Sequence, residues 1–167
     1  MKKGLSSVIT LTLICLVIAA LLGVVNGFTA PVIAKAEAKA VQDALLVVYP
    51  GGGTFEKLNL TSDLPPSVIE AYRSSNGGYC FKLSVTGYST GLQILCGIDG
   101  NGKVTGAKCM ASQETLGFEK TYGDSFIGKT SETVNAVDTV SGATKTTSAY
   151  KKAMKDALDS FVALENR

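Results

Sequence analysis

Hydroxyl side chains are concentrated in one segment near the C-terminus, which runs from Asp138 to Thr147 and reads DTVSGATKTT. Apolar residues at helical spacing follow it and predict a helix from about Thr144 to Leu164. The members of this stripe are Tyr150, Ala153, Met154, Ala157, Leu158 and Phe161. The hydroxyl-rich segment therefore lies at a helix N-terminus, where unpaired N–H groups and the positive end of the helix dipole attract anions. We expect a phosphate site there.

Helix capping is a simpler interpretation of the same segment. Serine and threonine are favoured N-cap residues, and Ser141 or Thr144 could serve only that purpose. Gly142 and Ala143 leave room for a phosphate to approach the backbone, which favours the anion site. The residue types alone leave both interpretations open.

The order of these residues resembles the flavinylation signature Asp-x-x-Ser-Gly-Ala-Thr-x-Thr. This signature belongs to the FMN-binding domain shared by the G subunit of Rnf complexes and the C subunit of Na+-translocating NADH:quinone reductase. The resemblance implies that Thr146 carries covalent FMN as a phosphoester, attached from FAD by a flavin transferase. Asp138 either assists that transferase or closes a turn. The resemblance assigns the rest of the phosphate end of the site to Ser141, Gly142, Ala143, Thr144, Lys145 and Thr147.

Other segments of the chain follow in the order of that family, and one of them is a second candidate part of the site. The family loop usually reads Glu-Thr-Pro-Gly-Leu-Gly. This chain has Glu114-Thr115-Leu116-Gly117 followed by Phe118-Glu119, without the proline and the final glycine. We expect Glu114, Thr115 and Leu116 at the flavin, the first two as hydrogen-bond partners, and Gly117 to allow close approach of the ring. An exposed loop without a ligand is the alternative.

The composition excludes several kinds of chemistry, because the residues that they require are absent. The chain has no histidine, so Ser-His-Asp hydrolysis and histidine-ligated zinc or haem are excluded. Its cysteines, at positions 15, 80, 96 and 109, form no C-x-x-C pair, which argues against a metal or iron–sulfur site. The net charge is only +2, and no basic run or face stands out, so nucleic acid is not expected as a partner. Redox chemistry would need an organic cofactor, and no catalytic residue is predicted.

The N-terminal segment has no charged side chain from Gly4 to Ala34. Residues 5–28 are enough to span a hydrocarbon layer of about 30 Å as a helix, so residues 1–30 are predicted to be a transmembrane anchor. A signal peptide is the alternative, although its apolar region is usually only about 7–15 residues long. Lys2 and Lys3 favour a cytoplasmic N-terminus, which puts the folded domain outside the cytoplasm as a single-pass protein of the cell membrane.

A stalk helix is predicted after the anchor, over residues 31–50. Pro31 is expected to mark a break or the first turn of a new helix. Val41, Ala44, Leu45 and Val48 recur at helical spacing up to about Tyr49. Residues 51–167 then form the FMN-binding domain.

The domain is predicted to begin with a short helix, from Ser67 to Arg73, introduced by Leu64-Pro65-Pro66. Alternating apolar residues predict strands over 79–85 and 92–98, and the turn Asp99-Gly100-Asn101-Gly102 leads into a third strand over 103–110. Pairing the apolar faces puts Cys80 and Cys96 on opposite sides of the sheet, so both are expected to be free thiols. The tyrosines at 79, 88 and 150 are expected to pack in the core or on the sheet.

The predicted fold is α+β, an antiparallel sheet with a C-terminal helix, preceded by one N-terminal transmembrane helix. The resemblance implies an electron-transfer subunit, not catalytic alone, in a membrane complex that couples ferredoxin:NAD+ electron transfer to cation translocation. Other Rnf-type subunits would be its partners. A stand-alone extracytoplasmic flavoprotein is the first alternative. A pilin-like subunit is the second, although Ile9 stands where pilins usually carry glutamate.

Overall fold

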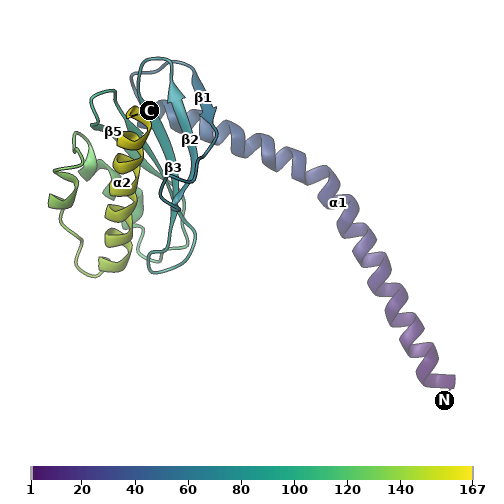
Figure 1. Cartoon of the computed structure of the whole chain (residues 1–167). Coiled ribbons are helices and arrows are strands. Elements are labelled where there is room, and N and C mark those ends of the chain that lie inside the picture. The colour runs from purple at the N-terminus through teal and green to yellow at the C-terminus, as the bar shows by residue number, and fades with distance from the viewer. Residues whose placement is uncertain (1, 167) are drawn as a thin grey trace. The chain divides into compact units, whose positions relative to one another are not determined.

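The N-terminal element is one long helix. The computed structural model describes residues 2–166, and α1 runs from Lys2 to Val48 (Figure 1). Its side chains from Val8 to Ala40 are all exposed, and its most apolar window has a mean hydropathy of 3.0. Thr12 and Thr29 donate their hydroxyls to carbonyls four residues earlier, so these polar groups need no water. The helix fits a single-pass membrane anchor by length and composition.

The predicted break at Pro31 is wrong, because Pro31 lies inside α1. Proline has no N–H to donate to the carbonyl four residues earlier, which here belongs to Gly27. The helical bonds on both sides of this point continue the helix past the single missing bond. Such prolines are tolerated within membrane helices.

From Asp43 onward the chain forms a compact unit around a five-stranded antiparallel sheet in the order β1-β2-β3-β4-β5. Its strands are β1 (Phe55–Leu58), β2 (Val68–Ser74), β3 (Tyr79–Val85), β4 (Leu92–Ile98) and β5 (Val104–Ala111). The α+β prediction and the three predicted strands are confirmed. The hairpin between β4 and β5 is confirmed too, since the Asp99 N–H donates to the Lys103 carbonyl at 2.9 Å.

The helix predicted from Ser67 to Arg73 is wrong, because these residues belong mainly to β2. Val68, Ile69 and Tyr72 favour a pleated surface over a helix, and β2 pairs with β3 along its length. The edge strand β1 was not predicted. Its backbone pairs with β2, and the Lys57 ammonium bonds the Glu70 carboxylate across the two strands at 2.8 Å.

One face of the sheet packs against α2, which runs from Thr144 to Glu165 (Figure 1). The predicted stripe of α2 is confirmed, since all six of its members are buried. Phe161 meets the ring of Tyr79 edge to face at 5.8 Å. The chain between β5 and α2 adds three short 3-10 helices, η1 (Phe118–Lys120), η2 (Tyr122–Phe126) and η3 (Val134–Ala136). The rings of Tyr122 and Phe126 pack against Tyr150 of α2.

The opposite face packs against the last turns of α1, where Ala44, Leu45 and Val48 are buried. Gly97 and Gly106 face each other on β4 and β5, and a Cβ on Gly97 would lie 2.4 Å from the Val48 carbonyl oxygen. The absence of side chains there lets the helix backbone approach the sheet. The sheet is therefore covered on both sides and forms a rigid support.

Two cysteines lie on these opposite faces, as predicted. Cys80 pairs with Gly97, whereas Cys96 pairs with Phe81 one register position away. Both thiols are free and buried. Burial raises the pKa of Cys80 to about 12 and raises that of Cys96 as well, which keeps both thiols protonated and unreactive.

Candidate functional site

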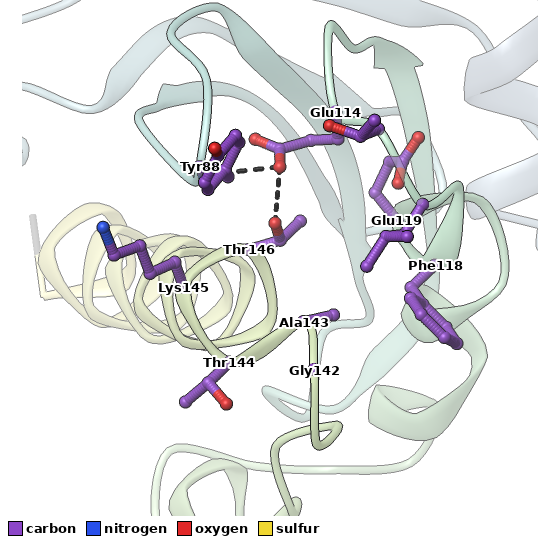
Figure 2. A pocket seen from close by; sticks show the side chains of 11 residues that line it. Tyr88, Glu114, Phe118, Glu119, Gly142, Ala143, Thr144, Lys145 and Thr146 are labelled. Carbon is purple, nitrogen blue, oxygen red and sulfur yellow. Dashed lines mark hydrogen bonds between the residues drawn. The ribbon is translucent and has the colours of Figure 1, made fainter.

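A pocket of about 440 Å³ lies between the start of α2 and the loop after β5 (Figure 2). This volume is within the range of sites for small molecules. We call residues 142–146 the helix wall. The loop wall consists of Glu114, Thr115, Leu116, Phe118 and Glu119. Tyr88, from the loop between β3 and β4, completes the lining.

The helix wall begins with an N-terminus that no side chain in the described part of the chain caps. Ala143 is the N-cap, so the capping interpretation of Ser141 or Thr144 is wrong. The first-turn N–H groups therefore remain available to an anion. Thr147, predicted at the site, is fully buried below it. Its hydroxyl bonds the Ala143 carbonyl and the Val140 N–H, at 3.0 and 3.2 Å, and so ties the incoming chain to the helix.

The two threonines of the helix wall differ in access. Thr144, the first residue of α2, is exposed. Thr146 is only 6% exposed, and its hydroxyl donates a hydrogen bond of 2.5 Å to Glu114 (Figure 2). Both residues line the pocket, and Figure 2 shows the Thr144 side chain directed away from Glu114.

Glu114 joins three segments of the chain. One oxygen accepts the Ser89 N–H at 3.1 Å, and the other accepts the Tyr88 N–H at 3.3 Å and the Thr146 hydroxyl. A Cβ on Gly87 would lie 2.5 Å from this carboxylate, so glycine is needed for the close approach. Both carboxylate oxygens of Glu114, a residue predicted to hydrogen-bond the flavin, are therefore engaged within the protein.

The remainder of the loop wall is partly apolar and partly acidic. Leu116 and Phe118 are exposed, whereas Glu119 is 2% exposed. Its Oε2 is buried and has no hydrogen-bond partner among the described residues. Gly117 does not line the pocket, and its φ of 73° explains the glycine instead. Sequence patterns did not point to Phe118 or Glu119, because the direction of their side chains depends on the 3-10 turn η1.

Tyr88 corrects another expectation. It is 70% exposed and lines the pocket, whereas packing on the sheet was predicted. The Lys145 ammonium lies 5.9 Å from the centre of its ring. Tyr79 and Tyr150 are buried, as expected. The position of Tyr88 between Gly87 and Gly91, in a loop, was the available signal.

Two more of the predicted site residues do not line the pocket. Ser141 is exposed just before the helix wall. Asp138 is also exposed, and its backbone carbonyl accepts the Tyr122 hydroxyl at 2.8 Å. Asp138 therefore lies on a surface that another protein can reach, outside the cavity.

The residues present fit FMN. The uncapped helix N-terminus and Lys145 suit its phosphate. Tyr88, Leu116 and Phe118 offer apolar surface to a flat ring. The unpartnered Oε2 of Glu119 offers a buried acceptor in the same pocket.

Comparison with known families agrees with this fit. The model described as RnfG N-terminal region matches residues 1–48, and the FMN-binding domain model matches residues 87–159. The chain is an RnfG-like FMN-binding protein. No curated protein matches it closely enough to count as a relative. All residues that line the pocket of this RnfG-like protein lie within the FMN-binding match, and the two matches support an Rnf-type FMN electron-transfer subunit.

Proposed function

We propose that this subunit carries FMN as a phosphoester on the helix wall and relays electrons in an Rnf-type complex that couples ferredoxin:NAD+ electron transfer to cation translocation. The observation that carries the covalent attachment is a threonine of the uncapped first turn of α2, Thr146, that lines the pocket of an FMN-binding domain. The match of residues 1–48 to the RnfG N-terminal region supports the complex.

We assign the ester to Thr146, the last threonine of the signature that the sequence resembles. Thr146 lines the pocket, and its hydroxyl donates a hydrogen bond to Glu114, so it lies at the junction of the two walls. Thr144 also lines the pocket, but Figure 2 shows its side chain directed away from Glu114. A phosphate on Thr146 lies in the first turn of α2, at the positive end of the helix dipole. The ester replaces the hydrogen bond to Glu114, and the phosphodiester turns away from that carboxylate.

A flavin transferase is the maturation partner in this proposal, since a threonine hydroxyl is a weak nucleophile by itself. The Thr146 oxygen forms a bond to the FMN phosphorus of FAD, the pyrophosphate bond breaks, and AMP leaves. The hydroxyl proton goes to a base on the transferase. Asp138 is exposed eight residues earlier and is available for the transferase to recognise.

The roles within the mature subunit follow from the pocket. Bound FMN supplies one-electron and two-electron redox chemistry. The first-turn N–H groups of α2 and the Lys145 ammonium hold the phosphate. Tyr88, Leu116 and Phe118 flank the ring, and the exposed side chains at this opening leave the ring edge accessible to a redox partner.

We further propose that α1 anchors the domain outside the cytoplasm, since Lys2 and Lys3 precede the apolar span. The domain would then meet the other Rnf-type subunits on that side of the membrane. Covalent attachment suits such a location, because a released cofactor would be lost.

Intact-mass analysis of the full chain, produced with and without a flavin transferase, tests the proposal. We expect a gain of one FMN less one water only with the transferase, and yellow fluorescence that survives on a denaturing gel. Flavin that is removed by unfolding would overturn the covalent carrier.

A further inference from the structure

Glu119 is the least satisfied acidic group of the pocket. It belongs to η1, it is 2% exposed, and no described residue bonds its Oε2. A buried carboxylate oxygen without a partner is strongly disfavoured, and proteins rarely retain one unless it meets a ligand, an ion or a catalytic demand. The side chain lines the cavity assigned to FMN, beside Phe118 (Figure 2).

Its neighbours do not remove the need for a partner. The Cys109 thiol lies close enough for the Glu119 charge to raise its pKa, but no hydrogen bond joins the two side chains. The other carboxylate of the pocket, Glu114, already accepts bonds on both oxygens. Tyr150 carries the second unpartnered buried oxygen of the described chain, yet it does not line the pocket. Glu119 is thus the carboxylate of the pocket that has an oxygen without a hydrogen-bond partner among the described residues.

We propose that Glu119 is a cofactor-contacting residue whose carboxylate accepts the imide N–H of the isoalloxazine ring and lowers the reduction potential of the flavin. The inference rests on the proposed occupancy of this pocket by FMN, but not on the covalent bond. The imide N–H is the one N–H donor of the oxidised ring, and its partner must be an acceptor. A negative charge beside the ring opposes the addition of electrons, which lowers the potential.

The division of the pocket supports this orientation. Lys145 and the first turn of α2 lie on the helix wall and suit the phosphate end of the cofactor. Glu119 lies on the loop wall together with Leu116 and Phe118, where apolar side chains suit the ring. A charged acceptor surrounded by apolar surface forms a strong hydrogen bond, because water does not compete for it.

The test compares full-length, flavin-loaded wild type with Glu119→Gln and Glu119→Leu, and uses Glu132→Gln at an exposed position as the control. Intact mass and flavin absorbance first establish loading. Redox titration then measures the midpoint potential, and NMR of protein loaded with ¹⁵N-labelled flavin measures the imide proton. We expect a positive shift of potential and an upfield shift of the imide proton in both Glu119 variants, with the control unchanged. Leucine removes the unpartnered group, so this variant keeps the test available if glutamine perturbs folding.

Loaded Glu119 variants with the wild-type potential and imide proton shift would overturn the inference and leave the proposed function intact. A wild-type chain that takes up no FMN in the presence of the transferase would overturn the proposed function, and the inference with it. The two failures are distinguishable because the mass is measured before the potential.

Discussion

The two walls of the pocket face the same cavity but present opposite kinds of group. The helix wall offers two threonines, Thr144 and Thr146, and an N-terminus without a side-chain cap. The loop wall offers two carboxylates that are held inside the protein, Glu114 through its bonds and Glu119 through burial. Under the proposed function, attachment needs a hydroxyl beside a helix N-terminus, whereas control of the flavin ring needs fixed groups shielded from water. The proposal assigns the first role to the start of α2 and the second to the turn that holds Glu119.

The largest effect on stability is expected at the junction between the walls, from Glu114→Ala. This change removes the acceptor of two N–H groups and of the Thr146 hydroxyl. We expect the free energy of unfolding to fall by about 3 kcal/mol, since bonds to charged groups contribute about 1.5–3 kcal/mol each and water replaces part of them. Denaturant titration of the full chain in detergent measures it. A loss no larger than that of the exposed control Glu132→Ala would show that the walls are not joined through Glu114.

Gly87→Ala tests the same junction from the other side. The added Cβ would lie 2.5 Å from the Glu114 carboxylate and 3.2 Å from the Thr146 Cα, so it should force them apart. We expect a loss of about 1–2 kcal/mol. In the double variant with Glu114→Ala, the total loss of unfolding free energy should be smaller than the sum of the two single losses. The reason is that one change removes the group that the other displaces. Full additivity in a double-mutant cycle would contradict this contact.

A smaller difference is expected between the two threonines of the helix wall. Thr146→Val removes a hydrogen bond to a carboxylate and should cost about 1–2 kcal/mol. Thr144→Val changes an exposed side chain and should stay within about 0.5 kcal/mol of wild type. Thermal unfolding of the flavin-free proteins gives both values. Equal losses would show that the Thr146 hydroxyl forms no stabilising bond to Glu114.

The smallest effect concerns the charge of the loop wall. Burial first and the Glu119 carboxylate second raise the pKa of the Cys109 thiol. Reaction with a thiol reagent requires the thiolate, so its rate should continue to rise with pH above the range of an ordinary thiol. Glu119→Gln removes one cause of the raised pKa, and we expect the rate profile to move to lower pH. A Cys15→Ser background excludes the exposed cysteine of the anchor. An unchanged profile would mean that Glu119 carries no charge near Cys109.

Sequence patterns predicted the parts of the molecule that depend on periodicity. The alternation from Tyr79 to Ile98 and the stripe on α2 reflect burial against one continuous core, and that burial leaves a period that can be counted. β2 lacks this signal. Its residues Ala71 and Tyr72 are adjacent and both buried, and a bulge interrupts its pairing near Val68. Residues 68–74 form a strand instead of a helix because they pair with β3, and this pairing cannot be inferred from their own sequence.

The site also has a part that local sequence predicts and a part that it does not predict. The position of the helix wall was predictable, because the segment from Ser141 to Thr146 is continuous and precedes a recognisable helix. The burial of Thr146 could not be predicted from the local sequence, because it depends on the position of Glu114, which comes from another loop. Tyr88 and Glu119 enter the pocket through loop and turn conformations that have no sequence period. Their roles depend on tertiary contacts that the local sequence does not encode.

The most direct test of the central claim is the mass of two matched variants, Thr144→Val and Thr146→Val, each produced as the full chain with a flavin transferase. We expect Thr146→Val to lack the added FMN entirely, and Thr144→Val to retain it. Fragmentation of the wild-type peptide should place the modification on Thr146. Covalent flavin on Thr146→Val together with its loss from Thr144→Val would contradict the assignment, and covalent flavin on both variants would contradict attachment at the helix wall through either hydroxyl alone.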